Sequence, residues 1–297
     1  MIRNLRFYRL ASDWPDTEEA LSERLEQAAF RPCGTLSERA MGFEAPLARA
    51  GDRLCRRLAG ADLIQLRIQT RVLPMAAVRE SLVERVEAFE HRTGREPSRR
   101  EVRELKEEVY GELLPRALLK SDRVWAFYLR DERVLAVGSA AASRAELVLD
   151  SLRAALGSLQ AVPLAYRQPA HSLLTRIFLG DAPPAFALGR ECRMQDLSEP
   201  GSTVNWLDMD LAGSAVRAHI KHGLAVDRLA LQFDGVLRCT LDQDLVVRKL
   251  RMEGLEALDE LDDEDPLARF DAEFTLVCGA VLRLLQGLKQ PLGGYAA

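Results

Sequence analysis

One stretch of the chain carries basic side chains along one side of a predicted helix. At about 100° per residue, residues 98–113 place Arg99, Arg103 and Lys106 in one stripe, largely opposite the glutamates of the same helix. Arginine presents forked donors that suit phosphate oxygens, and several such contacts release condensed counterions. The stripe therefore predicts a site that binds the DNA backbone without reading bases.

The same residues also fit an ordinary solvated helix face. Arg100 and Glu104, and likewise Arg103 and Glu107, have the i, i+4 spacing of surface ion pairs. Residues 92–116 hold six arginines and one lysine, which is a density that both interpretations accommodate. Composition alone leaves the two open.

Motifs of known enzyme classes do not occur in the chain. It lacks the glycine-rich phosphate loops, the G-x-S-x-G elbow and the H-E-x-x-H zinc motif. His219, His222 and Asp227 could hold a metal, but histidines at a helix end are typical of surface caps. The acidic residues of 259–265 could suggest a two-metal nuclease, yet contiguous carboxylates are typical of a solvated loop. We expect no catalytic residue, metal or cofactor.

Composition predicts a folded protein with unevenly placed charge. Of the 297 residues, 47% are apolar and 29% charged, and the net charge is −4. Residues 67–130 hold 14 basic against 11 acidic side chains, whereas residues 251–297 hold 4 against 10. The five scattered cysteines predict buried free thiols. Without a signal peptide or an apolar run of about 18 residues, we expect a soluble cytoplasmic protein with no membrane partner.

Apolar periodicity predicts the elements that position these residues. Helices are expected after Asp16 with Glu19 in a capping box, after Pro74, from Ser98 to Pro115, up to Gly157, and from Phe270 to Pro291. Strands are expected near 64–68, 125–129 and 245–252, with a hairpin at Asp234-Gly235. Segment 180–203, rich in proline and glycine, is expected to be irregular. The mixture favours an α+β fold with largely antiparallel sheets.

The helices near 75–113 lie between predicted strands, so we expect them to form an inserted helical arm. Residues 1–73 and 122–168 then form a central α/β region, and 74–121 form the arm. Residues 169–297 form a second α+β region, with a projecting finger near 180–210.

Short motifs in order along almost the whole chain resemble the RdgC family of bacterial recombination-associated proteins. They are Arg3-Asn4-Leu5, Tyr8-Arg9-Leu10, AFRPCG at 29–34 with Met41-Gly42, LLPRA at 113–117, LGSL at 156–159 with Val162-Pro163-Leu164, RFDAEF at 269–274 and, more loosely, residues 221–231.

The resemblance implies a horseshoe-like, elongated monomer that pairs head to head into a ring-shaped homodimer with a basic central hole. It also implies binding of single- and double-stranded DNA with little sequence preference, association with the nucleoid, and restraint of RecA-promoted recombination. Hole-lining basic positions fall on Arg95, Arg99 and Arg116, and Arg100 is basic as well. The full set of candidate DNA contacts is Arg71, Arg92, Arg95, Arg99, Arg100, Arg103, Arg116 and Lys221.

The chain departs from the family pattern at the ring gate, at the finger tip and at one lysine of the hole. Leu118 stands where the ring gate has an aromatic plug, and a smaller side chain there would weaken or reshape closure. Asp208 and Met209 stand at the finger tip in place of a basic and an amide residue, which weakens the case for a finger contact with DNA. Lys221 takes the place of a nearby lysine where this chain has Leu224.

Two other functions remain open from the sequence. The first is an interaction module that binds a recombination protein directly, without DNA, through the acidic C-terminal third. The second is a metal-dependent nuclease.

Overall fold

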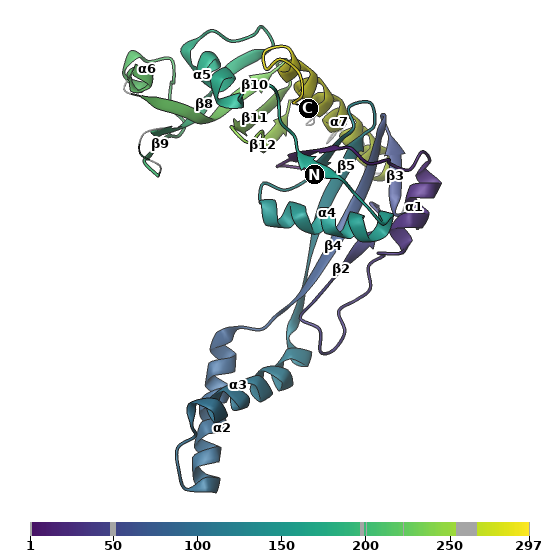
Figure 1. Cartoon of the computed structure of the whole chain (residues 1–297), viewed down its shortest axis with the longest axis vertical. Helices are drawn as coiled ribbons and strands as arrows, with labels where there is room; N and C mark the ends of the chain where they lie inside the picture. Colours follow the sequence, from purple (N-terminus) through teal and green to yellow (C-terminus); the bar gives the residue numbers. More distant parts are fainter. Residues whose placement is uncertain are drawn as a thin grey trace. The chain divides into compact units, whose positions relative to one another are not determined.

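The computed structural model describes residues 2–47, 52–196, 199, 201–221, 223–253 and 266–296. The described residues form two antiparallel sheets and seven α-helices (Figure 1). This arrangement confirms the predicted α+β class with antiparallel sheets. The acidic run at 259–265 and His222 lie outside the described residues.

The first sheet has seven strands in the order β2-β4-β5-β6-β1-β7, with β3 also paired to β4. Its strands are β1 (Arg6–Leu10), β2 (Arg39–Glu44), β3 (Cys55–Leu58), β4 (Ala61–Val72), β5 (Leu118–Leu129), β6 (Val134–Val137) and β7 (Ala161–Pro163). The strands predicted near 64–68 and 125–129 are the long strands β4 and β5.

The second sheet has five strands in the order β12-β11-β10-β8-β9. They are β8 (Phe186–Asp196), β9 (Thr203–Trp206), β10 (Leu224–Phe233), β11 (Leu237–Asp242) and β12 (Val247–Met252). Asp234, Gly235 and Val236 join β10 to β11, and the positive φ angles of Asp234 (51°) and Gly235 (70°) confirm the predicted turn.

The five predicted helices are present. The helices of the structure are α1 (Glu18–Glu26), α2 (Met75–Thr93), α3 (Arg99–Leu113), α4 (Ala142–Leu156), α5 (Ala170–Leu179), α6 (Ser214–Lys221) and α7 (Pro266–Lys289), with a short 3₁₀ turn, η2 (Leu114–Arg116). Helices α5 and α6 were not predicted.

Two local predictions were wrong. Helix α1 is capped by Thr17, whose hydroxyl accepts a hydrogen bond from the Ala20 amide, rather than by a box of Asp16 and Glu19. Segment 180–203 is not irregular throughout, because strand β8 occupies 11 of its residues and pairs with β10. The flanking prolines and glycines lie outside that strand or, at Gly189, in a register shift opposite β10, so they do not interrupt the sheet.

The chain divides into two compact units. Unit 1 comprises the described parts of 1–28, 45–65 and 125–297, and unit 2 comprises 29–44 and 66–124. The core of unit 1 gathers buried side chains of both sheets and of α7, including an edge-to-face contact of Phe127 with Phe274. The two helices of unit 2 have little interior, since Val78 is the only buried residue of α2 and Val109 the only one of α3.

Candidate nucleic-acid interface

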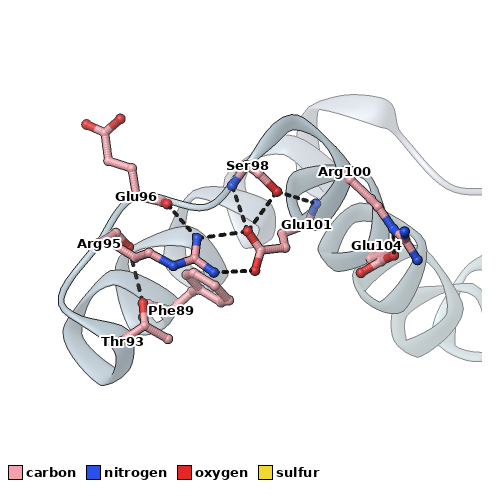
Figure 2. Close-up of polar contacts among 8 residues, drawn as sticks. All are labelled: Phe89, Thr93, Arg95, Glu96, Ser98, Arg100, Glu101 and Glu104. Carbon is pink, nitrogen blue, oxygen red and sulfur yellow. Dashed lines mark hydrogen bonds and ion pairs between the residues drawn. The ribbon is translucent and has the colours of Figure 1, made fainter.

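Helices α2 and α3 of unit 2 pack together as a hairpin, and local signals fix its turn. Gly94 ends α2 with φ 70°, a left-handed conformation that glycine adopts readily. Ser98 begins α3 with a capping box, because its hydroxyl accepts from the Glu101 amide while the Glu101 carboxylate accepts from the Ser98 amide at 2.8 Å (Figure 2). The capping box predicted from the sequence is confirmed.

Arg95 is held inside this turn. Its guanidinium donates to both carboxylate oxygens of Glu101, at 3.0 and 2.7 Å, and lies 5.3 Å from the centre of the Phe89 ring (Figure 2). The hydrogen bond from Arg95, together with those from the Ser98 amide and hydroxyl, lowers the pKa of Glu101 to about 2. Arg95 therefore already has an anionic partner.

Three other candidates also have neighbours on the hairpin. Arg100 donates to Glu104 at 2.9 Å, and the Arg103 guanidinium lies 3.9 Å from Glu107. These are the two surface pairs that the spacing predicted. Arg92 is exposed, and its guanidinium lies 5.8 Å from the centre of the Phe89 ring.

Arg99, Lys106 and Arg116 differ from these residues. All three side chains are exposed, and none has a carboxylate within 4.0 Å in the part of unit 2 that the structure describes. Arg99 begins α3, Lys106 lies two turns further along it, and Arg116 lies in the 3₁₀ turn that follows. Their charges are free to bind an external anion.

Arg71, near the end of β4, has a mainly structural environment. Its guanidinium donates to the carbonyls of Pro115 at 3.1 Å, Ala117 at 3.3 Å and Gly34 at 3.1 Å. These bonds hold the chain where it leaves the hairpin and enters β5.

Arg79 of α2 is a further exposed cation without a carboxylate partner among the described residues, and the sequence pattern did not single it out. Six of the eight candidates lie in the dense basic stretch 92–116, and an isolated arginine in the preceding helix gave no comparable signal.

The remaining candidates lie at separate places. Leu118, at the start of β5 in unit 2, has 79% of its surface exposed. In unit 1, Asp208 accepts a hydrogen bond from Arg190 at 2.7 Å, and Met209 beside it is exposed. Lys221 ends α6, and its side chain lies outside the described residues.

Two further sequence predictions concern a possible metal site at His219 and Asp227 and the state of the five cysteines. His219 packs against the Trp206 ring, and Asp227 pairs with Arg193. The described residues contain no group of three or more His, Cys, Asp or Glu side chains that could hold a metal ion. All five cysteines are buried and free, as predicted, and burial raises the pKa of Cys239 to about 12.

Comparison with known proteins decides the family. The family model described as "Putative exonuclease, RdgC" matches residues 1–295. This chain belongs to the RdgC family. Two RdgC relatives, from Aeromonas hydrophila and Shewanella oneidensis, are 32% and 33% identical to it over 295 residues, covering 98% of this chain and 97% of each relative. Both are named "Recombination-associated protein RdgC", so the resemblance seen in the sequence is confirmed.

RdgC relatives are thus named for recombination rather than for a catalytic activity, although the family description names an exonuclease. Within the described residues, no helix is long and apolar enough to cross a membrane.

Proposed function

We propose that this RdgC protein binds DNA through its phosphates, without reading base sequence, and that the α2–α3 hairpin provides the contacts. The observation that carries the proposal is the set of exposed cations without carboxylate partners among the described residues: Arg99, Lys106 and Arg116. A phosphate that binds them displaces only water and counterions. Arginine also offers phosphate a planar fork of donors, which favours Arg99 and Arg116 as the strongest contacts.

Arg92, Arg95, Arg100 and Arg103 join the site as weaker contacts. A phosphate must compete with the glutamates that pair with three of them, but exposed ion pairs contribute only about 0–1 kcal/mol. Arg71 acts mainly by holding the segment that carries Arg116, and Lys221 adds a cation from unit 1.

The family assignment extends this proposal to an assembly. Two elongated, horseshoe-like copies close into a ring around duplex DNA, with the exposed Leu118 at one of the contacts between them. Encirclement prolongs the time on DNA without base contacts. The protein thereby limits RecA-promoted recombination by occupying single- and double-stranded DNA at the nucleoid.

A mobility-shift titration on two unrelated duplexes of equal length tests the phosphate contacts. Arg99→Glu combined with Arg116→Glu should weaken binding at least tenfold, and equally on both duplexes, because each change replaces an attraction with a repulsion. Arg3→Glu with Arg24→Glu changes the net charge by the same amount on exposed residues of unit 1 and serves as the control. Equal losses of affinity in both double variants would contradict a role for the hairpin.

The proposed role is binding rather than catalysis. Labelled duplex incubated with the protein and magnesium should stay intact, whereas progressive loss of terminal nucleotides would favour the exonuclease named in the family description.

A further inference from the structure

The seven-stranded sheet ends at β7, an edge strand that belongs to unit 1. Just beyond β7, the Leu164 amide donates to the Phe7 carbonyl at 2.9 Å, which continues the pairing with β1. Because hydrogen-bonded pairs alternate along an antiparallel ladder, the N–H and C=O of Ala161 and the C=O of Pro163 point away from β1. None of these three groups has a backbone partner among the described residues.

The same edge already accepts a strand a few residues further along the chain. The Ala296 amide donates to the Ala165 carbonyl at 2.9 Å, and Tyr166 forms an antiparallel bridge with Tyr295. Residues 292–296 therefore add to this edge as a short strand. The open groups of β7 precede Ala165 directly, so an extended peptide can pair with them in the same way, through main-chain hydrogen bonds.

A cavity of about 520 Å³ lies along the open edge. Its lining includes Val162 and Pro163 of β7, and its charged members are Arg9 and Arg133, with no carboxylate among the described lining residues. Val162 is the register partner of Arg9, so the two side chains share one face of the sheet. Val162 has 58% of its surface exposed. The cavity therefore combines an open apolar surface with positive charge, which suits a ligand that has both apolar and anionic groups.

The two arginines are held by backbone carbonyls. Arg9 donates to the carbonyl of Ala296, and Arg133 donates to that of Ser12 at 3.2 Å. Neither has a carboxylate within 4.0 Å among the described residues. A carbonyl carries no net charge, so both guanidinium groups keep their positive charge and can form charge-assisted hydrogen bonds with an external carboxylate.

Glu132, which directly precedes Arg133, is already engaged elsewhere. Its carboxylate accepts from the Lys289 ammonium and, at 2.9 Å, from the Tyr295 hydroxyl. Only 6% of its side chain is exposed, and it does not line the cavity. The carboxylate that lies next to the arginines in sequence therefore does not occupy the site.

We propose that the open edge of β7 binds an extended acidic segment of a partner protein, which adds to the sheet as a strand antiparallel to β7. Side chains of a strand alternate between its two faces. Acidic residues of the segment would thus lie on the face of Arg9 and Val162, and apolar residues on the face of Pro163. The site needs neither DNA nor the α2–α3 hairpin, so it goes beyond the proposed function.

A second copy of the chain is a poorer occupant of this edge. Two-fold pairing of β7 with itself would bring Arg9 and Arg133 of both copies to the same edge, where like charges repel. Pro163 also lacks an N–H, and proline on an edge strand is a common protection against pairing between copies. An acidic segment meets the same edge with complementary charge.

Fluorescence anisotropy with a labelled eight-residue peptide of alternating valine and glutamate tests the site, in buffer without nucleic acid. Its carboxylates lie on one face and its apolar side chains on the other when it is extended. A peptide of alternating valine and lysine has the same pattern with the opposite charge and should bind at least about tenfold more weakly. Equal binding of the two peptides would overturn the assignment of an acidic partner.

Arg133→Gln should weaken binding of the glutamate peptide about tenfold, because it removes a charge-assisted hydrogen bond to a carboxylate. Arg24→Gln is the matched control, since Arg24 is an exposed arginine of unit 1 that does not line the cavity. It should leave the affinity unchanged. Equal losses in both variants would overturn the site.

Ala161→Pro tests the strand pairing itself. It removes the outward N–H but no bond to β1, and proline is tolerated on edge strands where the N–H faces solvent. Binding should fall about fivefold, the contribution of one backbone hydrogen bond, whereas Ala161→Ser keeps the N–H and should bind like the unaltered protein. Methylating the peptide's backbone nitrogens removes the same bonds without altering the protein and should also abolish binding. Full binding of the methylated peptide would overturn strand addition.

Two further measurements distinguish a partner segment from other occupants. Light scattering should give the same mass for the unaltered protein and Ala161→Pro, and a smaller assembly in the variant would overturn the proposal in favour of pairing between copies. Ala297 follows Ala296 and lies outside the described residues. Deleting it should leave the peptide affinity unchanged, and a gain would show that this residue occupies the edge instead of a partner.

Discussion

The cations of the α2–α3 hairpin fall into two classes at the level of single residues. Arg95, Arg100 and Arg103 each have a glutamate partner, whereas Arg99, Lys106 and Arg116 have none among the described residues. Both interpretations of the sequence therefore apply to one surface: part of it is a salt-bridged solvated face, and part is free to bind anions. DNA that reaches the unpaired residues can bind them without breaking an internal ion pair.

The Glu101 carboxyl gives a pH-dependent signal for the turn. Its pKa is lowered to about 2, so the Arg95–Glu101 contact stabilises the turn above the unfolded pKa of about 4.3, and this stabilisation disappears as pH falls through about 2. An NMR titration should therefore find a midpoint near 2. Arg95→Met should raise that midpoint, because it removes the largest cause of the shift. A midpoint near 4.3 in the unaltered protein would contradict the contact.

Asp62 is a buried carboxylate of unit 1 with several donors around it. Its carboxylate is fully buried and accepts from Trp14 at 2.8 Å, Arg57 at 3.0 Å and Arg130 at 3.2 Å. Asp62→Ala leaves these donors without an acceptor and should lower the free energy of unfolding by about 3–5 kcal/mol.

Urea denaturation measures this change. Asp150→Ala, which removes an exposed pair with Arg153, is the control and should change stability by less than about 1 kcal/mol. A comparable loss of unfolding free energy in the two variants would show that the buried hydrogen bonds of Asp62 contribute no more than an exposed ion pair.

At the scale of elements, the conformation of the α2–α3 hairpin depends more on the residues that end α2 and begin α3 than on packing between the two helices. Only Val78 and Val109 are fully buried in its two helices, so packing contributes less here than in unit 1. The Gly94 end of α2 and the Ser98 capping box fix the turn instead. The position of Arg99 directly follows from that box, because it is the first residue of α3.

Ser98→Ala should accordingly destabilise the start of α3 by about 1 kcal/mol, the typical contribution of an N-cap side chain. Amide hydrogen exchange in the first turn of α3 should accelerate about fivefold. Ser81→Ala, in the interior of α2, removes a serine that caps nothing and should leave exchange unchanged or slower. Equal acceleration in both variants would rule out a role for the cap.

Local signals explain which elements the sequence predicted well. The α3 capping box, the glycine after α4 and the Asp234-Gly235 turn each act within a few residues, and all three were predicted. Strand β8 was missed because its stability comes from pairing with β10, whose residues lie about 30 to 50 positions further along the chain. The same reason hid the role of Arg71, which donates to the carbonyl of Ala117, 46 residues further along the chain.

At the scale of the whole molecule, net charge is a poor guide to the ligand. The chain carries a net charge of −4, yet the exposed hairpin cations Arg99, Lys106 and Arg116 have no carboxylate within 4.0 Å among the described residues. Local fields at these sites govern binding. The proposed ring would bring the hairpins of two copies to one duplex. Each hairpin cation would then contact the DNA from both copies.

The dependence of duplex affinity on salt concentration tests the central claim most directly. Phosphate contacts predict that the logarithm of the association constant falls linearly with the logarithm of salt, with a slope of about −0.9 per contact. Arg99→Glu with Arg116→Glu should make the slope shallower by about 0.9 for each phosphate that the variant no longer neutralises, on either of two unrelated duplexes. An affinity that does not change with salt, or a slope that the double variant leaves intact, would contradict the account.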